Sequence, residues 1–330
     1  MRFVMEGIVV KGSKNLFTVK PAMPGVNVAV NPAGAVGQSA AHSAARLPAD
    51  SAGEGFIGGC IECRLKGKIL KDGESAYNPL APGDFVVFSP DSRLIESRLP
   101  RRNKFSRWNE KGRSSQVLAA NIDLVVCAAS PASPPFRPRF IDRVLVQAEV
   151  ENIPAAVVLN KSDLPLEAQD AARLDDFEKN GVPVLRVSAK NGDGLPSLQD
   201  FLAGKTTLLV GQSGVGKSSL VNRLFPDSNS KTGAVNKKFD RGNHTTVMSV
   251  LYEHERYTVI DSPGLRQFIP DGIDPENIAL YMKDIAPFAG QCLFGASCTH
   301  TVEKGCAILD AVSKGRIHED RYKSFLRMKD

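Results

Sequence analysis

The sequence predicts a multidomain chain: a small β-barrel of the OB type, a parallel α/β domain and a C-terminal helical domain with a Cys/His cluster. Three observations predict this order. Short strand-like segments with glycine turns occupy roughly the first 100 residues, strands and helices alternate from Ala119, and cysteines gather with a histidine near the C-terminus. We expect the barrel with its flanking segments over 1–113, the α/β domain over 114–272 and the helical domain over 273–330.

The composition is that of an ordinary globular protein and excludes several classes. The chain has 330 residues, of which 42% are hydrophobic and 24% charged. No apolar run approaches the roughly 20 residues that span a bilayer, and the N-terminus lacks a signal-peptide cleavage site. Six cysteines do not make a disulfide scaffold in a chain of this size. We therefore expect a cytoplasmic monomer without a membrane partner; the net charge of +6 is compatible with nucleic acid.

The N-terminal region reads as an interrupted barrel. Strand-like segments cover Arg2–Lys20, 60–70 and 83–89, with turn signals between them. The intervening stretch Pro21–Gly59 is rich in Ala, Gly, Pro and Ser and lacks any sustained period, which predicts a flexible loop or an insertion. Cys60 and Cys63 form a C-x-x-C pair with no second pair nearby, so we expect them to be core or incidental residues rather than metal ligands.

A basic stretch, Ser97–Arg113, follows the barrel. Seven cations outnumber one acid, and Phe105 and Trp108 are interleaved with them. The cations are Arg98, Arg101, Arg102, Lys104, Arg107, Lys111 and Arg113. Phosphates and stacked bases favour this composition, but a solvated basic linker has it too, and composition alone leaves both interpretations open.

The middle of the chain alternates strands and helices. Strands are expected over 121–130, 154–160, 182–189, 206–211, 247–254 and 256–264. Helices are expected over 139–152, 166–181, 195–202 and 217–225. This rhythm predicts a mostly parallel sheet with helices on both faces.

A phosphate-binding loop joins one of these strands to the next helix. The stretch "GQSGVGKS" fits G-x-x-x-x-G-K-[ST], whose glycines let successive backbone N–H groups point at phosphate oxygens. Lys217 is expected to reach the β- and γ-phosphates, and Ser218 to offer its hydroxyl to Mg²⁺. The predicted contacts with nucleotide are Gly211, Gln212, Ser213, Gly214, Val215, Gly216, Lys217, Ser218 and Ser219.

A second motif selects the base. In the N-K-x-D box, Asp163 can accept hydrogen bonds from the N1–H and 2-amino groups of guanine, whereas adenine would leave this carboxylate unpaired. Asn160 is expected to brace neighbouring loops, and the stem of Lys161 to lie over the base. One βα unit later, Ser188, Ala189 and Lys190 are expected to back the base from the far side.

The remaining catalytic candidates follow the phosphate loop. Asp261 of "DSPG" is expected to hold Mg²⁺ through water, and the Gly264 N–H to meet the γ-phosphate. Between them and the phosphate loop lies a polar segment in which Thr245 or Thr246 completes the Mg²⁺ site. Leu265 occupies the place where many GTPases carry a glutamine, so His244 is the candidate for orienting water; a surface histidine without a catalytic role is the alternative.

A Cys/His cluster marks the C-terminal domain. Cys292, Cys298, His300 and Cys306 lie within 15 residues. Three thiolates and one imidazole complete a tetrahedral zinc shell with no open position, which predicts one structural Zn²⁺.

The order of the guanine motifs is circularly permuted. N-K-x-D and S-A-K precede the phosphate loop, whereas an ordinary GTPase domain has them after D-x-x-G. Joining the old termini of such a domain and cutting it after D-x-x-G produces this order. Since the strand ending at Asp261 now leads into the C-terminal domain, a movement at Gly264 is expected to reposition that domain.

The permuted motifs, the "GNHTT" stretch and the Cys/His cluster together resemble the RsgA family, the circularly permuted GTPases of bacterial small ribosomal subunit maturation. The resemblance covers most of the chain. It implies a GTP hydrolase that acts as a late assembly factor, binds the small (30S) subunit and its rRNA, and hydrolyses GTP faster when bound. It also implies that His244 acts in hydrolysis.

Two other classes remain to be weighed. A P-loop kinase or ATPase would share the phosphate loop, but Asn160 and Asp163 speak against adenine. An RNA-binding protein with a vestigial nucleotide site would not need Lys217, Ser218 and Asp261, all of which are present.

Overall fold

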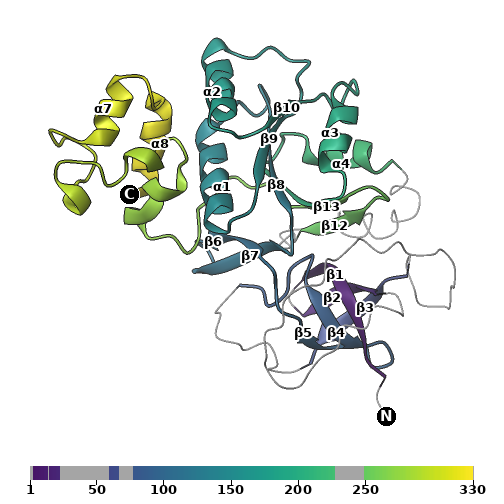
Figure 1. Cartoon of the computed structure of the whole chain (residues 1–330). Helices are drawn as coiled ribbons and strands as arrows, with labels where there is room; N and C mark the ends of the chain where they lie inside the picture. Colours follow the sequence, from purple (N-terminus) through teal and green to yellow (C-terminus); the bar gives the residue numbers. More distant parts are fainter. Residues whose placement is uncertain (1–2, 14, 23–58, 67–76, 227–248, 330) are drawn as a thin grey trace.

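The chain forms three parts that follow one another in the sequence (Figure 1). The computed structural model describes residues 3–13, 15–22, 59–66, 77–226 and 249–329, and everything below refers to these residues. A barrel lies against one edge of a central sheet, and the C-terminal domain lies beside α1, away from α3 and α4.

The N-terminal part is a closed five-stranded barrel, as the sequence predicts. Its strands are β1 (Met5–Ser13), β2 (Leu16–Pro21), β3 (Ile61–Leu65), β4 (Phe85–Ser89) and β5 (Leu94–Arg98). They close in the order β1-β2-β3-β5-β4, and only the β3–β5 pair among them is parallel. Strand alternation fills the interior with Val9, Phe17 and Val86, among others.

Cys63 belongs to this barrel interior. Its side chain is fully buried among the core residues, and burial raises the pKa of its thiol to about 11. Cys60, three residues earlier in the chain, is partly exposed. The core interpretation of Cys63 therefore agrees with the structure.

The basic stretch Ser97–Arg113, for which a linker was one of two interpretations, contains the first strand and the turn of a β-hairpin. Strands β6 (Lys104–Asn109) and β7 (Ser114–Ala120) pair antiparallel, so the boundary predicted between 113 and 114 falls in their turn. Phe105 is buried, with its ring 5.7 Å from that of Phe268. The sequence of β6 does not show the alternation of apolar and polar residues that indicates a strand, because most of its residues are polar.

Two of the seven cations in this stretch serve the fold. Arg101 makes a bidentate ion pair with the buried Asp84, with N···O distances of 2.7 and 2.8 Å. Arg102 pairs with Asp123 at 2.7 Å. These guanidinium groups are already engaged, so composition overstated the charge available to a partner.

The central domain is built on a six-stranded sheet in the order β10-β9-β8-β11-β13-β12. The strands are β8 (Leu124–Ala129), β9 (Ala155–Leu159), β10 (Val184–Arg186), β11 (Thr206–Gly211), β12 (Val250–Glu253) and β13 (Thr258–Asp261). All neighbours are parallel except β12 and β13. The predicted mostly parallel sheet is confirmed.

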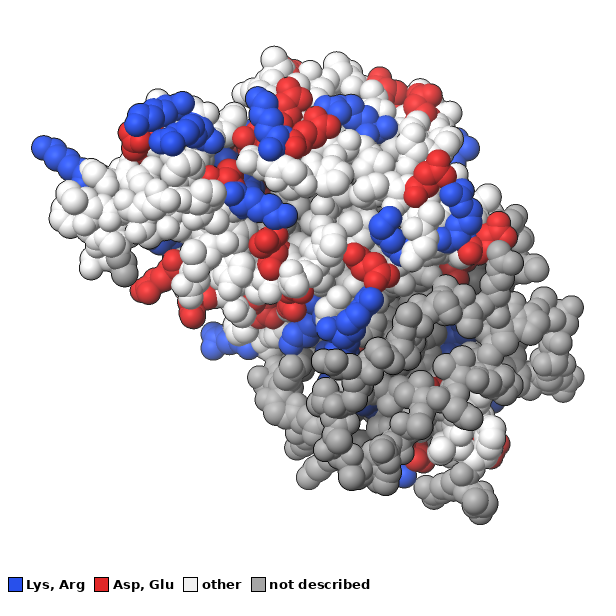
Figure 2. Space-filling view, in the orientation of Figure 1, with Lys and Arg blue, Asp and Glu red and all other residues white. Residues whose placement is uncertain are grey.

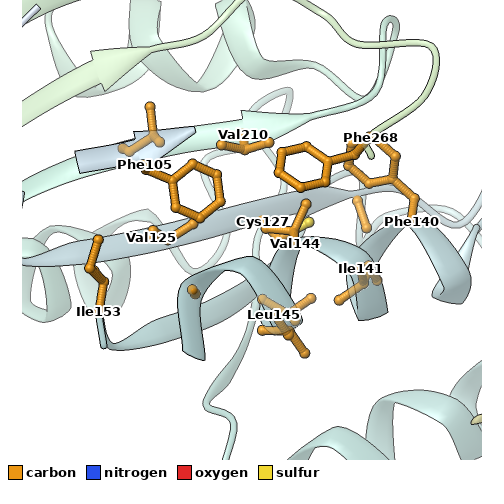
Figure 3. Packing of buried hydrophobic residues seen from close by; sticks show 14 of the residues in the cluster. Phe105, Val125, Cys127, Phe140, Ile141, Val144, Leu145, Ile153, Val210 and Phe268 are labelled. Atoms are coloured by element: carbon orange, nitrogen blue, oxygen red, sulfur yellow. The ribbon is translucent and has the colours of Figure 1, made fainter. Parts of the chain in front are cut away.

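Helices cover both faces of this sheet. α1 (Pro138–Val150) and α2 (Ala168–Lys179) pack on one face, and α3 (Leu195–Leu202) and α4 (Lys217–Leu224) on the other. Successive residues of β8 point to opposite faces, so Val125 and Cys127 join the first core and Val126 the second. Figure 3 shows the first core, where residues of α1 meet Phe105 and Phe268.

The C-terminal domain consists of short helices around a small core of its own. They are the 3-10 helices η1 (Pro275–Tyr281), η2 (Ala286–Phe288) and η3 (Gly295–Ser297), followed by α7 (Ala307–Ser313) and α8 (Glu319–Lys329). Val146 of α1 joins this core, so the domain packs directly on α1. None of the helices in the described part of the chain has the length and apolar character to span a membrane.

Charges of both signs are interspersed on the face shown in Figure 2. Lysine and arginine alternate with aspartate and glutamate over the central and C-terminal domains. Many of them are paired across short distances, including Arg256 with Asp200 and Lys314 with Asp310.

Candidate nucleotide site and metal centre

The glycine-rich loop joins the end of β11 to the start of α4. Gly214 and Gly216 have φ values of +86° and +91°, a region that side chains rarely adopt. A Cβ on Gly216 would lie 2.3 Å from the Asn160 side-chain nitrogen, and one on Gly211 would lie 2.5 Å from the Ala128 carbonyl oxygen. The loop can therefore hold this shape only with glycine at these positions.

Asn160 connects three loops at the end of β9. Its Nδ2 donates to the Val215 carbonyl oxygen at 2.9 Å, and its Oδ1 accepts from the Ala189 N–H at 3.0 Å. The side chain is almost fully buried. The N-K-x-D box, the phosphate loop and the S-A-K segment are thus held together by one amide.

Asp163 projects from the same box toward solvent. The Ser188 hydroxyl donates to its Oδ1 at 2.6 Å, and this hydrogen bond lowers the pKa of the carboxyl group. Ser188 in turn accepts from the Asn191 N–H at 3.2 Å. Asp163 is consequently ionised and oriented before any ligand arrives.

Lys161 links the phosphate loop to a segment that sequence reasoning missed. Its Nζ donates to the Gly214 carbonyl oxygen at 2.9 Å and to the Ser133 carbonyl oxygen at 2.5 Å. Ser133 lies between β8 and α1, in a stretch without a recognised motif. A backbone acceptor leaves no signature in the sequence, because any residue type supplies it.

Arg223 is a second residue that the motifs did not indicate. From the last turn of α4 it donates to the carbonyl oxygens of Ala189 and Lys190, both at 2.8 Å. It fixes the backbone of the S-A-K segment against the helix that follows the phosphate loop. Its position in the last turn of a helix is a weak signal, since cations are common there.

The phosphate side of the site contains a carboxylate with an unused oxygen. Asp261 ends β13 beside the phosphate loop, and its buried Oδ1 has no hydrogen-bond partner among the described residues. Burial raises the pKa of Asp261 to about 6, against the opposing charge of Lys217. A buried carboxylate oxygen of this kind is suited to a Mg²⁺ ion or to its water ligands.

Lys217 is folded back onto its own loop. Its Nζ donates to the carbonyl oxygens of Gly211 and Gln212, at 2.8 and 3.2 Å, and burial lowers its pKa. Ser218 and Ser219 follow it at the start of α4 and are exposed. Lys217 and the serines therefore line the same helix start, as the motif predicts.

The D-x-x-G segment lies directly on the phosphate loop. A Cβ on Gly264 would be 2.9 Å from the Ser213 Cα, and the Leu265 N–H donates to the Gly211 carbonyl oxygen at 3.2 Å. Leu265 itself is buried. His244, Thr245 and Thr246 lie outside the described residues.

The Cys/His cluster comes together in the C-terminal domain. The ligand atoms of Cys292, Cys298, His300 and Cys306 all lie within 4.8 Å of one another. The sulfurs of Cys292 and Cys306 are 3.7 Å apart, and His300 Nδ1 is 3.4 and 3.5 Å from them. A tetrahedral ion with Zn–S bonds of about 2.3 Å separates its sulfurs by about 3.8 Å, so the donor set fits zinc.

Local structure orients these donors. Cys306 caps the start of α7, where its sulfur accepts from the Leu309 N–H at 3.5 Å. The Tyr322 hydroxyl of α8 donates to the His300 carbonyl oxygen at 2.7 Å. The cluster is thereby tied to both helices of the domain.

A guanine-type box upstream of a phosphate loop, both at the carboxyl ends of one parallel sheet, defines a circularly permuted P-loop GTPase. The RsgA GTPase family model matches residues 98–269, more than half of the chain. The chain is 36% identical to a small ribosomal subunit biogenesis GTPase RsgA from Borrelia garinii subsp. bavariensis, over 80% of this chain and 86% of that protein. It is 37% identical to the protein of the same name from Chlorobaculum parvum, over 82% and 90%.

Solved structures agree. The YjeQ structure from Thermotoga maritima has a TM-score of 0.65 and 27% identity, covering 99% of this chain and 98% of that one. YloQ, described as a circularly permuted GTPase, has a TM-score of 0.62 over 99% and 94%; at 23% identity it supports the fold. The chain belongs to the RsgA GTPase family and is a GTP hydrolase.

Proposed function

We propose that this chain is a cytoplasmic, monomeric factor that acts in the late maturation of the small ribosomal subunit. The observation that carries the proposal is the match to relatives named small ribosomal subunit biogenesis GTPases, over 86–90% of their length. The barrel and the Cys/His domain lie on different sides of the GTPase domain, which suits a protein that contacts a large partner at several points.

In this proposal the nucleotide is bound by two sets of residues. The guanine base is read by Asp163 and supported by Asn160, Lys161, Ser188, Ala189 and Lys190. The phosphates lie on the backbone of Gly211–Ser219, with Lys217 swinging from the Gly211 and Gln212 carbonyls to the β- and γ-phosphates. The Gly264 N–H faces the γ-phosphate because it adjoins Ser213.

Hydrolysis requires a second group of residues. Ser218 and Asp261 would hold Mg²⁺, which neutralises charge that develops on the phosphates. Thr245 or Thr246 completes that site, and His244 orients the attacking water, since Leu265 has no polar atom in its side chain to do so. The unpaired Oδ1 of Asp261 supports the metal assignment.

Cys292, Cys298, His300 and Cys306 would hold one structural Zn²⁺. All four positions of a tetrahedral ion are then filled by the protein, so the ion stabilises the domain and takes no part in hydrolysis.

The rRNA partner is proposed to meet the exposed cations in the hairpin turn of the basic stretch. With Arg101 and Arg102 engaged by Asp84 and Asp123, the exposed Lys111 and Arg113 in the hairpin turn are better placed to contact phosphate. Trp108 beside them is 38% exposed and can stack on a base.

The deciding experiment compares GTP hydrolysis by the purified protein alone, with small subunits and with large subunits. We expect slow intrinsic turnover that only small subunits accelerate. Equal acceleration by large subunits, or by neither, would rule out the proposed coupling. The salt dependence of subunit binding tests the electrostatic part, because counterion release weakens phosphate contacts steeply as salt rises.

A further inference from the structure

A cluster of buried charges joins the GTPase domain to the C-terminal domain. We call it the clasp. It consists of Asp142 of α1, Arg173 of α2, Asp284 between η1 and η2, and Arg321 of α8. Arg321 donates from Nη1 to Asp142 at 2.5 Å and from Nε and Nη2 to Asp284 at 3.0–3.1 Å. Arg173 donates to both oxygens of Asp142 at 3.0 and 3.1 Å.

The clasp is withdrawn from water. The four side chains are between 0% and 5% exposed. Losing one partner from such a cluster leaves another buried charge uncompensated, whereas the intact cluster adds little net stability over apolar packing. The main effect of the clasp is therefore to fix the orientation of the C-terminal domain relative to the GTPase domain, because its hydrogen bonds form only in one arrangement.

Apolar packing across the same seam is incomplete. A cavity of about 300 Å³ lies beside the clasp, lined by Leu145, Ile153 and Phe177 on the GTPase side and by Tyr281 and Lys283 on the other. Arg321 also borders it. Since the side chains do not fill this space, hydrophobic contact alone does not determine how the domains sit.

The N-terminal end of α1, which carries Asp142, also adjoins the candidate nucleotide site. The segment before α1 contributes the Ser133 carbonyl oxygen that accepts from Lys161, and Pro134 Cδ lies 3.3 Å from the position of a Cβ on Gly214. Phe140 in the first turn of α1 packs edge-on against Phe268, which follows the D-x-x-G segment. The segment that leads into α1 thus contacts the phosphate loop, and Asp142, in the second turn of the helix, contacts Arg321 of α8.

We propose that the Arg321–Asp142 contact transmits nucleotide occupancy through α1 to the C-terminal domain. Arg321 and Asp142 are positioning residues, since neither touches the nucleotide site. This connection adds to the covalent one after Gly264, which the order of motifs already predicts. It depends on nucleotide binding by this chain and not on the ribosomal partner, so it can hold even where subunit stimulation fails.

Hydrogen exchange of the full-length, zinc-loaded protein tests the proposal. Saturating GDP is expected to slow exchange of the α8 amides at least threefold in the wild type. In Arg321→Met that response should be lost while GDP binding and zinc content remain. Arg316→Met is the matched control, because Arg316 pairs with Asp310 inside the C-terminal domain and does not reach α1.

A second variant keeps the proposal testable if Arg321→Met does not fold. Asp142→Asn keeps the size of the side chain and removes the charge, so it should reduce the response where Arg321→Met does not fold. The proposal is overturned if GDP does not slow amide exchange in α8 of the wild type. The same holds if the folded clasp variants respond as fully as Arg316→Met.

Discussion

In the proposed nucleotide site, the residues assigned to the base (the base half) and those assigned to the phosphates (the phosphate half) differ in how far the protein satisfies its own polar groups. On the base side, Asn160 and Asp163 both have hydrogen-bond partners within the chain. On the phosphate side, Asp261 has a buried oxygen without a described partner, and Lys217 is bound to carbonyl oxygens of its own loop. The base half is organised by folding, and the phosphate half is completed by its ligand.

This difference separates specificity from hydrolysis. An oriented base half discriminates nucleotides without reorganisation, because its donors and acceptors are already in place. The phosphate half gains more from binding, since a Mg²⁺ ion that accompanies the nucleotide would compensate the buried Asp261 carboxylate. Substitutions in the two halves should therefore have distinct signatures.

The largest effect is expected from Lys217→Ala. This change removes the cation that we propose meets the transferring phosphate, and a single lost contact of this kind lowers kcat by about 100- to 1,000-fold. Single-turnover GTP hydrolysis measures it, with the fold checked by circular dichroism. Hydrolysis at the wild-type rate would show that the activity belongs to a contaminant.

Asp163→Asn is expected to remove the selectivity for guanine. The amide no longer accepts from both guanine donors, so preference should move from GTP toward XTP by on the order of 10- to 100-fold. Competition binding with GTP, XTP and ATP measures the preference. If ATP already competes equally with GTP in the wild type, the assignment of the base is wrong.

Asp261→Asn probes the unfavourable charge of the phosphate half. The pKa of Asp261 is raised from 3.8 to about 6, so between these values the folded chain binds a proton that the unfolded chain releases. The nucleotide-free wild type should therefore gain stability as pH falls from 7 toward 4, by about 2–3 kcal/mol from this group.

The variant should lack this gain and be more stable than the wild type at pH 7, although Mg²⁺-dependent hydrolysis is lost. Urea denaturation at pH 5, 6 and 7 can be followed by the fluorescence of Trp108, the single tryptophan, which lies on the hairpin beside the GTPase domain. Parallel pH profiles for the two proteins would contradict the expectation.

The smallest effect is expected from Arg223→Met. Two hydrogen bonds to the S-A-K backbone are lost, but Asn160 and Ser188 remain, so nucleotide affinity should fall only about threefold to tenfold. Titration of GDP measures the change. Lys179→Met, on the exposed end of α2, is a control that should leave affinity unaltered.

The sequence predicted helices and strands accurately where the hydrophobic periodicity was strong. Segments 195–202 and 206–211 form α3 and β11 with the expected bounds, because apolar periodicity and flanking glycines agree there. The β6–β7 hairpin was missed because its cations suggested a linker. The partnership of Arg101 with Asp84 also could not be predicted, since tertiary structure alone brings those residues together.

The motifs predict which side chains lie close together, and their roles toward a nucleotide stay predictions. Asn160, Asp163, Ser188 and Asp261 meet at one edge of the sheet because motifs specify side chains at the ends of parallel strands. Lys161 and Arg223, in contrast, act on backbone carbonyls, and a carbonyl acceptor is independent of residue type. The sequence carries no record of such partners.

The barrel has a consequence for how the GTPase domain behaves by itself. β12 is one of the two edge strands of the sheet. β1 lies against it, and Lys20 of β2 pairs with Glu253 at its end. An uncovered edge strand is a template for pairing with other chains. A fragment that starts after the barrel is therefore expected to self-associate. The N-terminal domain would then protect the enzyme from aggregation by covering this edge strand.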